Sequence, residues 1–181
     1  LGVPDIPRIA GTEIIGPYDA VKPLWERSAS VARPADADFW PLMEIRAGVP
    51  TVLEQTVEAF VPQMSNLQLI DGVSFTKGCY TGQEVVARMQ YLGKLKRRMY
   101  RAHVDTDDRP APGTELFSHS SESGQGAGRI VDAAPAPAGG YEVLAVIQIS
   151  SAEADDLRLG GPDGPPLELL ELPYAFSVDE G

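Results

Sequence analysis

Residues 77–84, Lys-Gly-Cys-Tyr-Thr-Gly-Gln-Glu, contain the single cysteine of the chain, Cys79. The four residues that begin at Thr81 fit a capping box, in which the Thr81 hydroxyl and the Glu84 carboxylate would each accept a hydrogen bond from a backbone amide at a helix start. The pattern therefore predicts a helix that begins at Thr81, with Cys79 two residues before it.

Three features beside Cys79 favour the thiolate form over the thiol. Unpaired amides at a helix N-terminus attract an anion, and Lys77 adds a nearby positive charge. Gly78 permits a tight backbone turn that would direct the sulfur toward a cleft. We therefore expect an accessible, reactive thiol, with Lys77 as its partner. The alternative is that Cys79 is a small buried hydrophobic residue, which is the commoner role of a lone cysteine.

The elements around this motif change in character near residue 92. Before it, the pattern predicts a strand at 9–15, a helix at 20–30, a strand at 39–45 and a helix from 51 that Pro62 ends. After it, short apolar runs separated by Pro- and Gly-rich turns predict strands at 97–104, 114–117, 128–133, 141–147 and 167–172. The chain is thus predicted to be α+β, with an α/β part at 1–92 and a small antiparallel β-barrel at 93–181.

Composition limits the function classes. The 181 residues carry 15 Lys and Arg against 26 Asp and Glu, a net charge of −11, so the surface as a whole repels nucleic acids and anionic membranes. A single cysteine excludes an internal disulfide, and no apolar run is long enough to cross a bilayer, so we expect a cytoplasmic protein. The first residue is not methionine, and we expect a preceding N-terminal part that completes the protein.

Basic residues cluster in one run, residues 88–101, which holds six of the 15 Lys and Arg. Such a run could contact phosphate or an acidic partner. No RNA-binding signature accompanies it, so a solvated surface is the preferred interpretation. The two histidines, His103 and His119, have no zinc-ligand spacing relative to Cys79, and we predict no metal site.

The motif at 77–84 and the preceding residues 60–76, FVPQMSNLQLIDGVSFT, resemble the signature of the YgfZ family, which is related in fold to the glycine-cleavage T-protein. The resemblance extends from Trp40 through EIRAGVP at 44–50 to Arg88. It implies the second half of a ferredoxin-like, T-protein-like folate-binding lobe followed by a C-terminal β-barrel. It also implies that tetrahydrofolate binds and that iron–sulfur enzymes or their assembly proteins, including enzymes that modify tRNA, are the partners.

The resemblance also implies roles for individual residues. Cys79 would carry the chemistry, of a kind that the resemblance leaves open, and Lys77 would assist it. Trp40 would stack on the folate ring system, or else be a core residue. Arg46 would meet the glutamate carboxylates of folate, or else be a solvated charge at a strand end. The remaining motif residues would line the cofactor site: Tyr80, Gln83 and Glu84.

Two other functions stay open at this point. The chain could be an aminomethyltransferase of the T-protein kind, although that chemistry needs a carboxylate and no thiol. It could also be a non-catalytic scaffold whose barrel docks a partner, in which case Cys79 would be structural.

Overall fold

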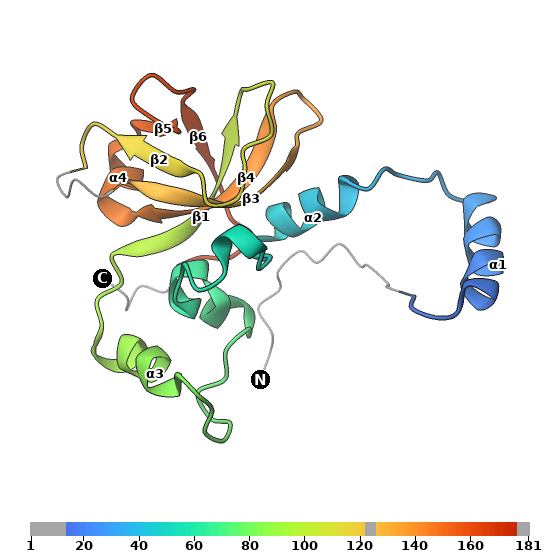
Figure 1. Ribbon diagram of the computed structural model, residues 1–181, viewed down its shortest axis with the longest axis horizontal. Helices are drawn as coiled ribbons and strands as arrows, with labels where there is room; N and C mark the ends of the chain where they lie inside the picture. The colour runs from blue at the N-terminus through green and yellow to red at the C-terminus, as the bar shows by residue number, and fades with distance from the viewer. Residues whose placement is uncertain (1–13, 122–125, 177–181) are drawn as a thin grey trace.

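A computed structural model describes residues 14–121 and 126–176 of the chain. A β-barrel forms the C-terminal part, and helices and short 3-10 turns lie on one side of it (Figure 1). Within the described part, no helix has the length and apolar character needed to cross a membrane.

The barrel is a six-stranded antiparallel sheet with the strand order β5-β2-β3-β4-β1-β6. An isolated bridge between Arg158 and Pro166 brings the two edge strands together, so the sheet is nearly closed. The strands are β1 Arg97–Val104, β2 Glu115–Ser118, β3 Gly128–Pro135, β4 Tyr141–Gln148, β5 Leu157–Leu159 and β6 Leu167–Leu170. A short helix, α4 Ile149–Ala154, connects β4 to β5.

The barrel strands have one buried face inside the barrel and, on β1, β3 and β4, a second buried face outside it. Alternate residues of a strand point to opposite faces, so β4 contributes Val143, Ala145 and Ile147 to the interior, and Leu144 and Val146 to the outer cluster. A register shift between Ile130 and Asp132 interrupts the alternation of β3, so Ile130 and Ala133, three residues apart, both join the interior, and Val131 and Ala134 both join the outer cluster. Because β4 is buried on both faces, its sequence is a nearly continuous apolar run at 143–147.

Helix α2, Phe39–Ala47, covers part of the outer face. Its buried residues, Leu42 and Ile45, are three apart and therefore on one helix face. The Asp36 carboxylate accepts a hydrogen bond from the Phe39 amide (3.1 Å) near the helix start, and Gly48, in the left-handed region (φ 67°), ends the helix. The strand predicted at 39–45 is therefore wrong, because this segment packs by helical spacing.

Three 3-10 helices follow: η1 Glu54–Thr56, η2 Pro62–Ser65 and η3 Leu67–Ile70. The helix predicted from residue 51 is wrong. The Thr56 hydroxyl bonds back to both the amide and the carbonyl of Leu53 (3.1 Å each), and Glu58 adopts a positive φ of 58°, so the chain turns before a helix can continue.

Two predicted helices are confirmed. Helix α1, Tyr18–Ala29, has no buried residue and projects away from the rest of the molecule (Figure 1). Helix α3, Gln83–Leu92, begins after Gly82, whose φ is 84°. The capping box at Thr81 is wrong, because Gly82 is the N-cap residue and no side chain caps the helix.

The strand predictions after residue 92 are confirmed, with small shifts at the ends of most of them. Strand β5 and helix α4 were not predicted. The strand predicted at 9–15 lies mostly outside the described residues, and residues 14–17 have no regular structure. The division into parts at residue 92 stays a prediction.

Candidate functional site

Cys79 lies exposed in the loop between η3 and α3. The Lys77 amide donates a hydrogen bond to the Ser74 hydroxyl (3.2 Å), and the Lys77 ammonium lies 4.5 Å from the centre of the Tyr80 ring. A β-carbon added to Gly78 would meet no atom within 4 Å. Cys79 therefore lies in an open loop, two residues from Lys77 in the chain, and the buried alternative for Cys79 is wrong.

The other motif residues shape the end of this loop. The Tyr80 amide donates to Gln83 Oε1 (3.3 Å), and the Gln83 amide donates to the Tyr80 carbonyl (3.2 Å). This reciprocal pair fixes the turn that precedes α3, although it does not cap the helix. Glu84 is exposed in the first turn of α3, where a carboxylate is favourable to the helix dipole. The motif residues are thus close together, as the sequence predicted.

Helix α3 is attached to the 3-10 segment by Gln63. The buried Gln63 side chain donates from Nε2 to the carbonyl of Val86 (2.7 Å), and Val86 itself is buried. At the other side of the loop, the rings of Phe75 and Tyr91 meet edge to face with centres 6.4 Å apart. These contacts hold the loop that carries Cys79 relative to the rest of the protein.

Asn66 connects the 3-10 segment to the barrel. It is fully buried in the left-handed conformation (φ 58°), and its Nδ2 donates to the Met99 carbonyl (2.7 Å) and to the Tyr174 hydroxyl (3.3 Å). The Tyr174 hydroxyl donates in turn to the Gly48 carbonyl (2.8 Å). Burial raises the pKa of Tyr174 to about 12. Sequence reasoning gave no role to Tyr174, because its partners are far from it in the chain.

Trp40 lies on α2 with 53% of its surface exposed, and its Nε1 donates to Glu44 one turn away (3.0 Å). The core alternative for Trp40 is therefore wrong. About half of the Trp40 surface is open to contact, and the stacking of its indole on a pterin stays a prediction.

Arg46 has a partner that the sequence did not reveal. Its Nε and Nη2 bind the buried Glu142 of β4, with distances of 3.0 and 2.6 Å to Oε1 and 3.2 Å from Nε to Oε2. This hydrogen bonding raises the pKa of Arg46. Arg46 is thus neither on a strand nor simply solvated. Its contact with folate carboxylates stays a prediction, and one edge of its guanidinium is already occupied.

The structure does not bring all predicted site residues together. Trp40 and Arg46 lie on α2 beside the barrel, whereas the Cys79 loop and α3 lie on the far side of the 3-10 segment (Figure 1). The basic run is also dispersed: Arg98 is buried with its guanidinium 4.8 Å from the Phe176 ring centre, and Arg101 approaches Glu142 (3.8 Å). In the part of the chain that the structure describes, no group of three His, Cys, Asp or Glu could hold a metal ion.

Comparison with known proteins gives one consistent result. No protein-family model matches the chain. Over 157 residues it is 34% identical to the tRNA-modifying protein YgfZ of Yersinia pestis (strain Pestoides F) and to that of Yersinia pseudotuberculosis serotype O:1b, and 33% identical to that of Yersinia enterocolitica. Each match covers 87% of this chain and 48% of the relative. The chain therefore spans about half the length of these curated relatives.

Proposed function

Because the chain is a homologue of the YgfZ proteins, consistent with the C-terminal part of that family, we propose that it takes part in tRNA modification. We further propose that it does so as a folate-binding accessory protein for the synthesis or repair of iron–sulfur enzymes, some of which modify tRNA. Cys79 would supply the chemistry. The observation that carries the proposal is the exposure of this thiol in an ordered motif loop.

The loop supports chemistry at Cys79 in two ways. Because the Cys79 thiol is exposed, it can reach a partner or ligand while the protein stays folded, whereas a buried thiol cannot. The Lys77 ammonium lies 4.5 Å from the centre of the Tyr80 ring, and this contact holds the Lys77 side chain within the loop that carries Cys79. The exposure of Cys79 and the position of Lys77 depend only on residues of this loop and of α3.

Tetrahydrofolate is the proposed cofactor, with Trp40 as its stacking platform. We expect this chain to bind reduced folate weakly by itself, because relatives about twice as long would contribute further pocket residues. In a protein of the relatives' full length, Trp40→Ala should weaken tetrahydrofolate binding by about 1 to 3 kcal/mol if the indole covers the pterin. Calorimetric titration of tetrahydrofolate into this chain, into the full-length protein and into its Trp40→Ala variant tests both expectations. An unchanged affinity in Trp40→Ala would remove Trp40 from the site.

The functional test is a chimera in which this chain replaces the matching region of the Yersinia pestis relative. The chimera is expressed in a Yersinia strain that lacks its own protein, and modified nucleosides of bulk tRNA are measured by mass spectrometry. We expect the chimera to restore modification and its Cys79→Ser variant to fail. Thr81→Ala is the matched control, because Thr81 is an exposed residue of the same loop that does not cap α3.

The results for the two variants distinguish a role of the thiol from a scaffold role. Full restoration by Cys79→Ser would contradict the proposal and favour a scaffold that docks a partner. Loss of function in both Cys79→Ser and Thr81→Ala would point to the shape of the loop rather than to the thiol.

A further inference from the structure

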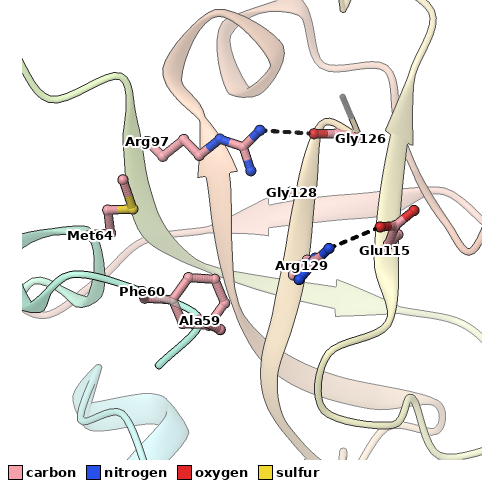
Figure 2. A pocket seen from close by; sticks show the side chains of 8 residues that line it. All are labelled: Ala59, Phe60, Met64, Arg97, Glu115, Gly126, Gly128 and Arg129. Atoms are coloured by element: carbon pink, nitrogen blue, oxygen red, sulfur yellow. Dashed lines mark hydrogen bonds and ion pairs between the residues drawn. The ribbon is translucent and has the colours of Figure 1, made fainter. Parts of the chain in front are cut away.

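A pocket of about 440 Å³ lies between residues 59–64 and the outer face of the barrel (Figure 2). Phe60 and Met64 line it from the 3-10 side, and Arg97, Arg129 and Glu115 line it from the barrel strands. None of these residues belongs to the Cys79 motif. The pocket has the size of small-molecule binding sites, which are commonly 300 to 1,000 Å³.

The pocket carries positive charge in an acidic protein. Its two arginines outnumber its one carboxylate, Glu115, whereas the whole chain has a net charge of −11. The strand order places β3 and β1 on either side of β4. Adjacent strands are about 4.8 Å apart, so the backbones that carry Arg129 and Arg97 are roughly 10 Å apart across the sheet. Two guanidinium groups that approach one cavity from separate strands can share an anion such as phosphate.

Both guanidinium groups are held by weak contacts. Arg129 Nη2 pairs with Glu115 Oε1 at 3.2 Å, but both side chains are at least half exposed. Arg97 Nη2 donates to the Gly126 carbonyl at 3.3 Å. Exposed contacts of this kind contribute little to stability, so a bound anion can replace them at little cost.

The opposite wall is apolar. Phe60 and Met64 are partly buried and pack against the outer core cluster, which fixes their position. An aromatic ring beside a thioether suits a flat heterocycle, because nucleic-acid bases stack favourably on aromatic side chains. The pocket therefore combines an anion site with a platform for a ring.

We propose that this pocket binds a nucleoside monophosphate unit, with its phosphate on Arg97 and Arg129 and its base against Phe60 and Met64. The unit could come from a free mononucleotide or from an unpaired nucleotide of an RNA strand, since both have the same chemistry. The proposal goes beyond the function proposed above and needs neither folate nor the Cys79 thiol, so each can fail without the other.

The test is calorimetric titration of the chain with AMP, adenosine, inorganic phosphate and a single-stranded oligo(A) of eight nucleotides. We expect saturable binding of AMP and at least tenfold weaker binding of adenosine and of phosphate. Tighter binding of the oligonucleotide, with competition by AMP, assigns the site to RNA. Binding of AMP but not of the oligonucleotide assigns it to free nucleotides. No saturable binding of AMP or oligonucleotide overturns the proposal.

Variants test the location of the site. Arg97→Gln and Arg129→Gln should each weaken AMP binding at least tenfold, and Phe60→Leu should weaken AMP binding but not phosphate binding. Glu115→Gln should strengthen AMP binding severalfold, a gain that misfolding cannot mimic. Arg27→Gln removes the same charge from α1, outside the pocket, and should change nothing. If AMP binds with equal affinity to the Arg97, Arg129 and Glu115 variants, the pocket is not its site.

Discussion

The barrel and the helical part before it are built in different ways. In the barrel, residues 142–147 of β4 are all buried, on two faces of the sheet. In the helical part, α1 has no buried residue, and α2 has only Leu42 and Ile45. The barrel is held together by a continuous apolar core, whereas the helical part depends on a few contacts with it.

Several of those contacts are polar and come from single residues. Asn66 binds the Met99 carbonyl of β1, and Arg46 binds Glu142 of β4. Within the helical part, Gln63 holds α3 to the 3-10 segment. A segment attached in this way can keep a loop such as the Cys79 loop in place and still leave its side chains open to solvent. The difference indicates that the barrel supplies most of the buried core and that the helical part carries the exposed Cys79 loop.

The largest expected effect is in the barrel core. Ile147→Ala removes a fully buried side chain from the barrel interior and should lower the free energy of unfolding by about 2 to 5 kcal/mol. Leu24→Ala on α1 is the matched control and should change it by at most about 0.5 kcal/mol. Urea unfolding followed by circular dichroism measures both. Equal losses would mean that α1 is part of the same core.

The next effect concerns the ion pair between the two parts. Glu142→Gln removes a buried charge from Arg46 and Arg101 and should lower the free energy of unfolding by about 1.5 to 3 kcal/mol. Glu115→Gln removes an exposed partner of Arg129 and should cost at most about 1 kcal/mol. The same unfolding measurement compares them. A loss at Glu115 as large as that at Glu142 would contradict the account.

A smaller effect is expected at Asn66. Asn66→Gly keeps the left-handed backbone but removes both hydrogen bonds of Nδ2, so the loss should be about 1 to 2 kcal/mol. Asp71→Gly is the matched control, because Asp71 has the same φ of 58° but is exposed. Limited proteolysis should show faster cleavage between the two parts in Asn66→Gly only. Equal behaviour of the two variants would show that Asn66 does not join the parts.

The effect that is smallest at neutral pH is a change of stability with pH. The pKa of Tyr174 is raised to about 12 in the folded protein, above the ordinary value of 10.0, so the unfolded chain loses this proton first. Stability should therefore be unaffected by Tyr174 below pH 10 and fall as the pH rises from 10 toward 12. Thermal unfolding of wild type and Tyr174→Phe between pH 9 and 11.5 measures this. The wild type should lose more stability than Tyr174→Phe, and parallel curves would contradict the burial of this hydroxyl.

Sequence patterns predicted the barrel better than the helical part, for a physical reason. Strand β4 was predicted at 141–147 and spans Tyr141–Gln148, because burial on both faces gives an apolar run, at 143–147, that lies next to a Pro- and Gly-rich turn. The segment 39–45 was predicted as a strand, since its short apolar run does not distinguish a strand from a helix. The three-residue strand β5 is too short to give a pattern.

In the candidate site, too, the sequence predicted local features but not contacts between distant residues. The exposure of Cys79 could be predicted, because it depends on neighbours within the loop. The partner of Arg46 is 96 residues away in the sequence, and Asn66 meets Tyr174 across 108 residues. Such pairs form only when the two parts pack together, so local spacing could not reveal them.

The central claim is that the helical part presents Cys79 open for chemistry while the protein stays folded. Alkylation by iodoacetamide at neutral pH, followed by intact-mass spectrometry with and without urea, tests it most directly. We predict one adduct, at Cys79, that forms in the folded protein at least as fast as in the unfolded chain, and more slowly in Lys77→Met. A thiol that reacts only after unfolding would contradict the claim.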